Sequence, residues 1–217
     1  MQDTTRRSFV AQAIAFGGTL SILNATPTQA ADNDLIARMS WFNEPALSRR
    51  VGEKLVVHSR PKTDFWRKTF YGYITDNGHF LHLKADSDFV FEARVNGQYA
   101  ALYDQAGLMV RINAENWMKC GTEFFEGKRH ASVVFTREFS DWSTMPDLTE
   151  NGPAWWRVVR KGESLETLCS LDGKVFASVR QGYFPASTAE VGIMCAAPEG
   201  TGFDAEFDHL SLSPWKK

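Results

Sequence analysis

The sequence has 217 residues and is rich in aromatic residues, which make up 13% of it and include 16 Phe and 7 Trp. Its formal net charge is −2, and its basic residues form no long run, so it offers no electrostatic basis for binding nucleic acid or an anionic membrane. Beyond the N-terminal segment, no apolar stretch approaches the ~18–20 residues that span a bilayer. We therefore expect a mature protein that is soluble and has no membrane anchor.

The N-terminal segment carries the marks of an export signal. Paired arginines in Arg6-Arg7-Ser8-Phe9 precede a weakly apolar run from Ala11 to Ala25, and Thr28-Gln29-Ala30 has a small-x-small cleavage pattern. The segment resembles a bacterial twin-arginine signal, which implies a periplasmic or secreted protein cleaved near Ala30. The alternative is a chance Arg-Arg pair ahead of a short amphipathic helix. We expect residues 1–30 to be the signal and residues 31–217 a single domain.

From about Ser40 onward, apolar and polar residues alternate and turn residues recur every few positions, as in β-sandwiches. Asn77-Gly78, Asn96-Gly97 and Asp172-Gly173 are candidate turns, the last a tight hairpin, and Asn113–Glu115 is a candidate helical turn. About a dozen one-sided strands predict an all-β fold of two packed antiparallel sheets, a sandwich or jelly roll. The expected strands are Lys54–Ser59, His79–Lys84, Phe89–Val95, Ala101–Asn113, Asn116–Phe125, His130–Glu138, Ala154–Arg160, Leu165–Ser170, Val175–Arg180, Val191–Ala196 and Gly202–Ser213.

The cysteines and histidines do not form a metal-binding pattern. Cys120, Cys169 and Cys195 each lie in an apolar strand pattern, so we expect buried thiols, with one disulfide as the alternative. His79 and His82 are three apart on an expected strand and point to opposite faces. Asp86-Ser87-Asp88 lacks the further ligands of a calcium loop. We expect no metal and no cofactor.

Several blocks of this sequence resemble a family of concanavalin A-like proteins of unknown function that is labelled "regulation of enolase"-like. The Tyr103–Leu108 block is also similar to the β-sandwich appended to some β-xylosidases. The resemblance implies a two-sheet jelly roll with a concave face, in a superfamily of lectins and glucanases, but it implies no particular activity. The matching blocks are Asp64–Arg67, Asp76–Phe80, Tyr103–Met109, Glu115–Lys119, Glu138–Ser143, Ser170–Gly173 and Cys195–Gly200.

The carboxylates of a glucanase are incomplete in this sequence. Retaining enzymes of that superfamily use a Glu-x-Asp-x-x-Glu strand, which sets acid and nucleophile about 5–5.5 Å apart. The nearest segment, Glu206-Phe207-Asp208-His209-Leu210-Ser211, has Ser211 where the last Glu belongs. Its acidic residues share one strand face and its apolar residues the other, which is the pattern of an ordinary half-buried strand. We therefore predict no catalytic residue there.

A polar face on three middle strands is the strongest candidate site. Alternation places apolar residues such as Leu108, Met118 and Val133 toward the core and a polar and aromatic set on the opposite face. An aromatic ring that stacks on a pyranose, with amide and charged groups for its hydroxyls, is typical of sugar recognition. The alternative is a solvated or loop-covered sheet face. The candidate ligand-binding residues are Gln105, Arg111, Trp117, Lys119, Glu123, His130 and Trp142.

Other residues allow two interpretations. Asp104 falls on the core side by alternation, where it either anchors a neighbouring loop or serves as an acid with a raised pKa. Trp142 follows an expected strand end, where it is either a second stacking platform or a plug over the core edge. Trp66, with Tyr71 and Tyr73, offers the same two interpretations.

These observations predict an exported protein that binds carbohydrate, or a related polyhydroxylated ligand, on its concave face without catalysis. Trp117 would stack on the sugar. One alternative is a glycan-active hydrolase whose carboxylate pair comes from separate strands, Glu123 with Asp104 or Glu138. Another is a structural protein that docks an unknown protein partner.

Overall fold

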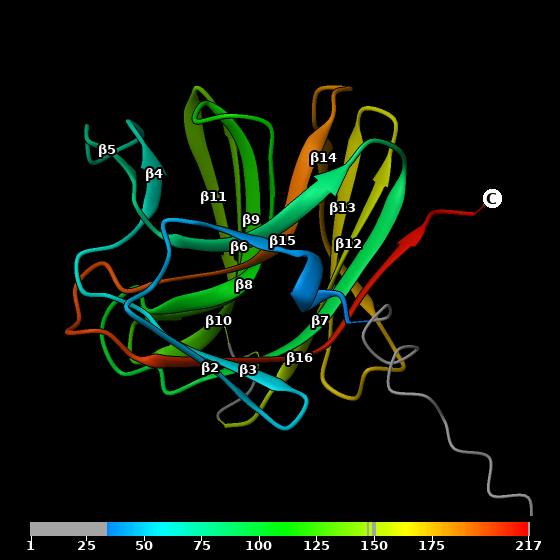
Figure 1. Ribbon diagram of the computed structural model, residues 1–217. Helices are drawn as coiled ribbons and strands as arrows, with labels where there is room; N and C mark the ends of the chain where they lie inside the picture. The colour runs from blue at the N-terminus through cyan, green and yellow to red at the C-terminus, as the bar shows by residue number, and fades with distance from the viewer. Residues whose placement is uncertain (1–33, 147, 149–150, 217) are drawn as a thin grey trace, which may run out of the picture. The chain divides into compact units, whose positions relative to one another are not determined.

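Strands of alternating apolar residues build two seven-stranded antiparallel sheets that pack face to face (Figure 1). The computed structural model describes residues 34–146, 148 and 151–216. Asp34–Lys217 group as one compact unit. The predicted twin-arginine signal and its cleavage near Ala30 lie outside the described residues. The predicted all-β sandwich of two antiparallel sheets is confirmed.

Half of the neighbouring strand pairs in the two sheets are consecutive in sequence, and the other half are distant because the chain crosses between the sheets. In spatial order, sheet A contains β1 (Ser40–Phe42), β6 (His79–Ala85), β15 (Ala189–Ala196), β8 (Gln105–Arg111), β9 (Asn116–Phe125), β10 (Lys128–Arg137) and β11 (Phe139–Met145). Sheet B contains β14 (Ala177–Tyr183), β13 (Ser164–Ser170), β12 (Ala154–Lys161), β7 (Phe89–Gly97), β16 (Asp204–Pro214), β3 (Lys54–His58) and β2 (Leu47–Val51). A separate hairpin pairs β4 (Phe65–Arg67) with β5 (Ile74–Asp76), and a short 3-10 helix, η1, covers Ile36–Arg38.

The main core fills the space between the two sheets. Strand β7 shows how alternation builds it, because Phe89, Phe91, Ala93 and Val95 are buried while the residues between them are half-buried. The same rule holds in β16, where Ala205 and Phe207 enter the core beside outward acidic residues. Burial of such side chains is the dominant favourable contribution to folding, at about 25 cal/mol per Å² of apolar surface removed from water.

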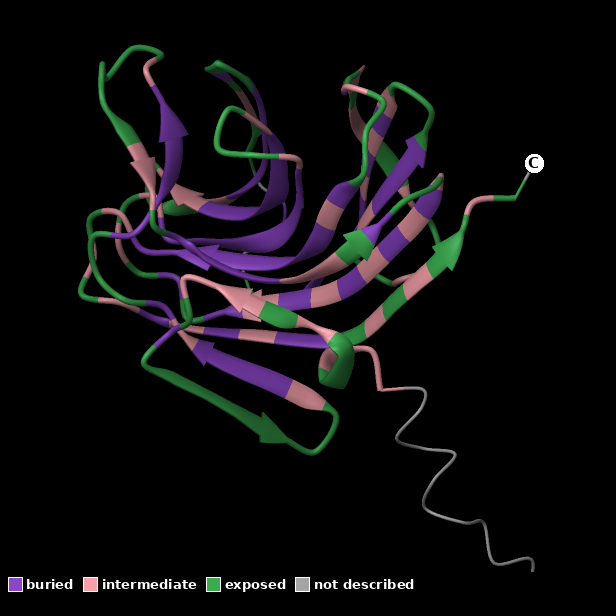
Figure 2. Ribbon diagram, turned by 45° about the horizontal axis from the view of Figure 1, so that its top comes forward, coloured by how far each residue is buried: buried purple, intermediate pink, exposed green. Residues whose placement is uncertain are grey.

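A second apolar cluster lies on the other side of sheet A, on the face that points away from sheet B. We call this the outer face. Hairpin β4–β5 stands over it, and Figure 2 shows buried residues on both the hairpin and the strands beneath. The central strands β8 and β9 are therefore buried on both faces, and the expected one-sided exposure is wrong for them. The cluster consists of Phe65, Trp66, Phe80, Met109, Trp117, Val134 and Met194.

Two glycines let strands β8 and β9 approach closely beneath this face. Gly107 and Gly121 are direct cross-strand partners. A Cβ on Gly107 would overlap the carbonyl oxygen of Cys120, and a Cβ on Gly121 would overlap that of Ala106. Alanine at either position would therefore require the backbone to move.

The turns and short strands differ most from expectation. Asn116–Phe125 is a strand with the predicted bounds, whereas β1, β2, β4, β5 and β11 were not expected. Asp172-Gly173 lies in the longer connection between β13 and β14 rather than in a tight hairpin, although Gly173 does have a positive φ of 71°. Asn96-Gly97 is inside β7, and the segment Asn113–Glu115 is not helical.

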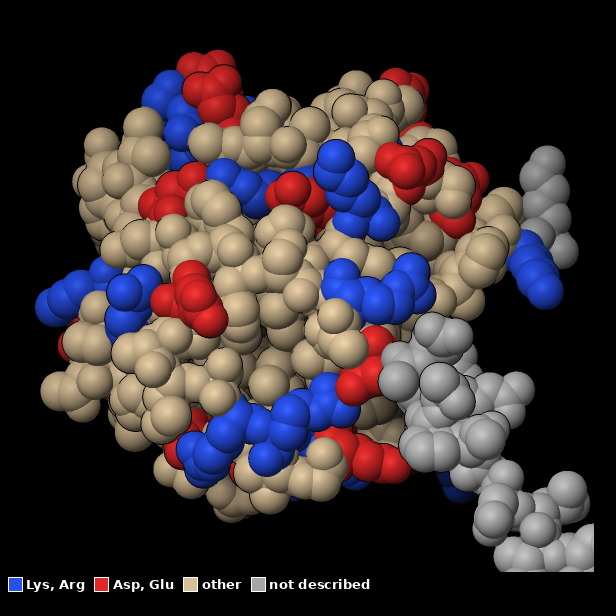
Figure 3. All heavy atoms as spheres, in the orientation of Figure 1, with Lys and Arg blue, Asp and Glu red and all other residues tan. Residues whose placement is uncertain are grey.

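The remaining features concern thiols, membranes and charge. Cys120, Cys169 and Cys195 are buried and unbonded, as expected, and burial raises the pKa of the Cys195 thiol to about 12. Among the described residues, no helix is long and apolar enough to cross a membrane. The face seen in Figure 3 carries basic and acidic side chains interspersed, rather than a field of one sign.

Candidate functional site

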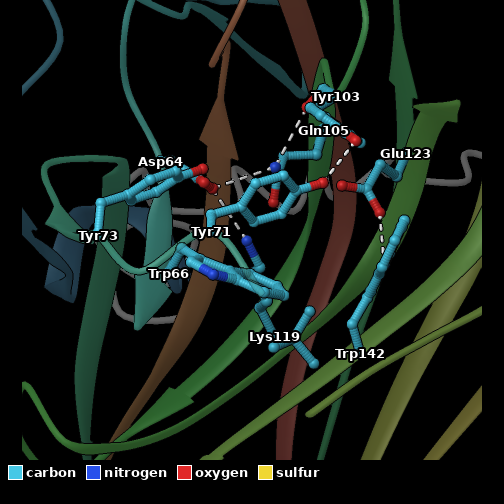
Figure 4. A pocket seen from close by; sticks show the side chains of 10 residues that line it. Asp64, Trp66, Tyr71, Tyr73, Tyr103, Gln105, Lys119, Glu123 and Trp142 are labelled. Carbon is cyan, nitrogen blue, oxygen red and sulfur yellow. Dashed lines mark hydrogen bonds and ion pairs between the residues drawn. The ribbon is translucent and has the colours of Figure 1, made fainter. Parts of the chain in front are cut away.

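A small cavity of about 20 Å³ opens on the outer face of sheet A, between the sheet and hairpin β4–β5 (Figure 4). The hairpin and the connections beside it supply one wall, and strands β8 to β11 supply the floor and the opposite wall. The combination of two acids, one amide and one amine with many rings is typical of sites that orient a small polar ligand. The lining residues are Asp64, Trp66, Tyr71, Tyr73, Tyr103, Gln105, Lys119, Glu123, Val134 and Trp142.

Aromatic side chains surround the mouth of the cavity. A wider hollow of about 720 Å³ shares Trp66, Tyr71, Tyr103 and Trp142 with the cavity and adds Phe125 and other rim residues. The rings contact one another mostly edge to face. The ring centroids of Tyr71 and Trp66 are 5.6 Å apart, and those of Trp142 and Tyr103 are 6.2 Å apart. Such contacts hold the rings in place around the opening.

The floor is organised by a buried ion pair. Lys119 Nζ lies 3.1 Å from Asp64 Oδ1 and donates to the carbonyl oxygen of Phe65 at 2.7 Å. The amide of Gln105 donates to Asp64 Oδ1 at 3.3 Å and to the Tyr103 carbonyl at 3.1 Å. Because both charged groups are nearly excluded from water, each depends on the other to offset its desolvation.

The local sequence around Asp64 explains how this carboxylate reaches the floor. The Asn77 side chain accepts a hydrogen bond from the Asp64 amide at 2.8 Å, and the Asp64 carbonyl accepts from the amides of Asn77 and Gly78. On the hairpin, the Arg67 amide donates to Ser140 Oγ at 2.9 Å, which ties β4 to β11. The start of β4 is thereby tied to the turn that leads into β6, and its end is tied to strand β11.

Glu123 is the second carboxylate of the cavity and has no cationic partner. Its Oε2 accepts a hydrogen bond from Trp142 Nε1 at 3.0 Å, and Trp142 Nε1 also lies 3.1 Å from Ser132 Oγ. Glu123 forms no ion pair with another described residue. Burial raises the pKa of this carboxyl above its usual range, although the field of Lys119 lowers it.

Two phenols of the wall are joined by a hydrogen bond of 2.7 Å between the hydroxyls of Tyr71 and Tyr103. Burial raises the pKa of Tyr73 to about 12, and the negative charge of Asp64 adds to the shift. Burial and the bond to Tyr71 raise the pKa of Tyr103 as well. Tyr73 and Tyr103 therefore remain neutral hydrogen-bonding groups at physiological pH.

Four of the predicted site residues line this cavity together: Gln105, Lys119, Glu123 and Trp142. Trp117 does not, because it is 1% exposed, packs edge to face against Phe65 and donates from Nε1 to the Ala114 carbonyl. Its predicted role as a stacking platform is therefore wrong. The hairpin covers it, as the alternative of a loop-covered face anticipated.

Arg111 and His130 also lie on the outer face but outside the cavity lining. Arg111 makes a two-pronged pair with Asp76 at 2.8 and 2.7 Å, which fixes β5 to the sheet. His130 is buried beside the Phe125 ring, and neither of its ring nitrogens has a partner among the described residues. Neither residue is placed to contact a ligand in the cavity.

Asp104 is the loop anchor rather than the acid. Its Oδ2 accepts hydrogen bonds from the amides of Ala100 and Ala101 at 3.0 and 2.8 Å, and it does not line the cavity. Glu138 is also outside the cavity and pairs with Lys68 at 2.7 Å on the surface. The carboxylate pairs considered from the sequence, Glu123 with either of these residues, are not assembled in this site.

The sequence did not group the other lining residues of the cavity with the predicted site. Trp66, Tyr71 and Tyr73 were recognised as a candidate platform or plug, and they form the wall. Asp64 and Tyr103 appeared only within the blocks that resemble a family. No group of three or more His, Cys, Asp or Glu side chains among the described residues is arranged to hold a metal ion.

The family described as "Protein of unknown function (DUF1349)" matches residues 41–215. The chain is also 38% identical over 182 residues to "Regulation of enolase protein 1" of Saccharomyces cerevisiae, across 83% of this chain and 92% of that protein. This chain belongs to the DUF1349 family. A solved structure, described as a functionally unknown protein from Saccharomyces cerevisiae, is 38% identical, has a TM-score of 0.81, and is matched over 84% of this chain and 99% of that one.

More distant structures share the sandwich with this DUF1349 chain. A mutant of the GH43 protein BlXynB from Bacillus licheniformis has a TM-score of 0.65 at 17% identity, over 82% of this chain and 37% of that one. The carbohydrate-binding module CBM66 from Bacillus subtilis has a TM-score of 0.54 at 12% identity, over 80% of this chain and 94% of that one. At these identities the likeness shows the fold alone.

Proposed function

We propose that this protein binds a small carbohydrate, or a related polyhydroxylated ligand, on the outer face of sheet A without breaking it down, with the sugar ring in the wider hollow and a polar group in the small cavity that adjoins it. The observation that carries the proposal is the cavity itself, in which aromatic walls enclose Gln105, Lys119 and Glu123. A pyranose has apolar ring faces and polar edges, and these walls and this floor complement both. The shared sandwich of a carbohydrate-binding module supports the same interpretation.

Each part of the cavity has a definite role in this proposal. Trp66, Tyr71 and Trp142 pack against the ligand ring. The amide of Gln105 and the carboxyl of Glu123 bond its hydroxyls, while Asp64 holds Lys119 in place. Because the rings already contact one another, little side-chain freedom is lost on binding.

A glycan-array screen followed by titration calorimetry tests the proposal. We expect Tyr71→Ala to weaken binding of the best glycan by about tenfold or more with an unchanged melting temperature, and Gln105→Ala to weaken it similarly with a lower melting temperature, because Asp64 and the Tyr103 carbonyl lose a buried donor. Tyr183→Ala is the matched control, because Tyr183 is similarly exposed on β14. If the array shows no glycan binding, the proposal fails and a protein partner becomes the better hypothesis.

The same glycans should be assayed for release of reducing ends. We expect none, because Asp64 is held by Lys119 and neither Asp104 nor Glu138 lines the cavity. Release that Glu123→Gln abolishes would overturn the non-catalytic proposal and establish a glycan-active enzyme.

We also propose that the protein is exported by the twin-arginine route, on the basis of Arg6-Arg7 and the Thr28–Ala30 cleavage pattern. Residues 1–40 fused to a reporter should deliver it to the periplasm, and the double change Arg6→Lys and Arg7→Lys should retain it in the cytoplasm. Delivery that is insensitive to this change would contradict the proposal.

A further inference from the structure

The charges of the cavity do not cancel. Lys119 is engaged by the Asp64 carboxylate at 3.1 Å and by the Phe65 carbonyl at 2.7 Å, so the ammonium and Asp64 form a closed pair. Glu123 is left as the carboxylate without a cation among the described residues. Its hydrogen-bonding neighbours, Trp142 and Ser132, are neutral.

A buried carboxylate of this kind is costly to ionise in the empty protein. Glu123 is 6% exposed and lies in the floor of the cavity. Burial of a lone charge disfavours its ionised form unless an opposite charge or strong donors compensate. A cation that enters the cavity would supply the missing partner.

The walls offer the second half of a cation site. Trp66, Tyr71, Tyr73, Tyr103 and Trp142 all line the cavity, and Figure 4 shows their rings gathered around the side chains of the floor. Aromatic faces attract ammonium groups, and several aromatic rings grouped together are a recurring arrangement for binding alkylammonium ligands. These rings line a cavity whose unpaired ionisable group is a carboxyl.

We propose that the ligand of this cavity is an amino sugar, a carbohydrate with a free protonated amine, whose ammonium pairs with Glu123 between the aromatic walls. This inference rests on the proposed carbohydrate-binding function and specifies its ligand class. The hydroxyls of the sugar are bonded by Gln105, and its ring packs against Trp66 and Tyr71. Acetylation of the amine removes the positive charge of the ligand and places a bulkier group next to the carboxylate of Glu123.

Calorimetry with matched ligands tests this proposal without altering the protein. The probes are glucosamine, galactosamine and chitosan oligosaccharides, each compared with its N-acetylated form and with the neutral parent sugar, at neutral pH, where Glu123 ionises more readily than in acid. Choline is included as a cation without a sugar ring. We expect at least one free amino sugar to bind about tenfold or more tightly than both its N-acetylated and its neutral counterparts.

Variants then assign the selectivity to Glu123. Glu123→Gln should remove most of the preference for the free amine while retaining residual sugar binding. Glu138→Gln is the matched control, because Glu138 is a carboxylate on the surface outside the cavity. The melting temperatures of both variants are measured, and the acetylation series stands on its own if Glu123→Gln fails to fold.

The outcomes separate this inference from the proposed function. Neutral or N-acetylated glycans that bind as tightly as amino sugars would overturn the amino-sugar inference and leave carbohydrate binding intact. Choline binding without any sugar binding would overturn both, and so would an array without a single bound glycan. A preference for the free amine that persists in Glu123→Gln would overturn the role given to Glu123.

Discussion

At the scale of single residues, Glu123 connects the site to the stability of the protein. Its pKa is raised by burial, with Asp64 adding to the rise and Lys119, Ser132 and Trp142 opposing it. The folded state therefore holds this proton at pH values where the unfolded chain, with an ordinary pKa of about 4.3, has released it. The stabilising contribution of the Glu123 carboxyl is present in full at pH values below its pKa in the unfolded chain. This contribution is lost as the pH rises through its pKa in the folded protein.

We therefore predict that Glu123→Gln gains stability relative to the wild type as pH rises from about 4 to about 7, by about 1.4 kcal/mol for each unit by which the folded pKa is raised. Urea unfolding at several pH values measures this difference. Glu138→Gln should show a small change of opposite sign, because Lys68 lowers the pKa of Glu138 on the surface. A difference between Glu123→Gln and wild type that stays constant with pH would contradict the prediction.

The pair of Lys119 and Asp64 leads to a second prediction at this scale. Their side chains are 6% and 11% exposed, so removal of one partner leaves the other charge buried. We expect Lys119→Met to destabilise the protein by about 3–5 kcal/mol. The double variant Lys119→Met and Asp64→Asn should lose less than the sum of the two single variants, as a double-mutant cycle by urea unfolding measures. Additive losses would show that the two groups are not coupled.

At the scale of single residues, the sequence predicted four of the residues that line the cavity, which are Gln105, Lys119, Glu123 and Trp142. Alternation correctly placed Gln105, Lys119 and Glu123 on one face, because strand periodicity fixes the side to which a side chain points. It could not say what covers that face, so Trp117 was expected to be exposed and is buried. Asp64 was missed because it approaches Lys119 only through a hairpin that folds back over the sheet.

At the scale of elements, hairpin β4–β5 determines whether the outer face holds a cavity or an open surface. Phe65 inserts its ring between the hairpin and the sheet, next to Gly78 at the start of β6. A Cβ on Gly78 would overlap this ring, while the backbone of Gly78 does not need a positive φ. Gly78→Ala therefore displaces the hairpin without changing any residue that lines the cavity.

We predict that Gly78→Ala costs about 1–3 kcal/mol, the usual range for overpacking, and weakens ligand binding through displacement of Asp64 and Trp66. Urea unfolding and calorimetry measure the two effects. The double variant Gly78→Ala and Phe65→Leu tests the cause, because a smaller side chain at position 65 makes room for the methyl group. If binding to Gly78→Ala equals that of wild type, the hairpin does not position the cavity walls.

Element-scale prediction succeeded for long strands and failed for short ones. Asn116–Phe125 was found with its bounds because ten residues give the alternation enough repeats. Strands β4 and β5 have only three residues each, too few for a period to be visible, and they are held by contacts with distant residues such as Ser140 and Arg111. Such contacts follow from the tertiary structure and leave no local pattern in the sequence.

At the scale of the whole molecule, the two apolar clusters give the sandwich an uneven distribution of burial. Strands β8 and β15 lie at the centre of sheet A, between the main core and the cluster under the hairpin, and nearly all their residues are buried. Strands β2 and β14 are the edges of sheet B, and all five residues of β2 are exposed. Local opening exposes little apolar surface at these edges and a large amount at the centre of sheet A.

We therefore predict that amides of β8 and β15 exchange with solvent hydrogen only through global unfolding, whereas paired amides of β2 and β14 exchange faster by a factor on the order of 100 or more. Native-state hydrogen exchange across a series of denaturant concentrations measures both sets. The central amides should share one free energy of opening that falls with denaturant, and the edge amides should be insensitive to denaturant at low concentration. Equal protection at the edges and the centre would show that the sandwich opens as one unit, and that the hairpin cluster adds no separate stability to sheet A.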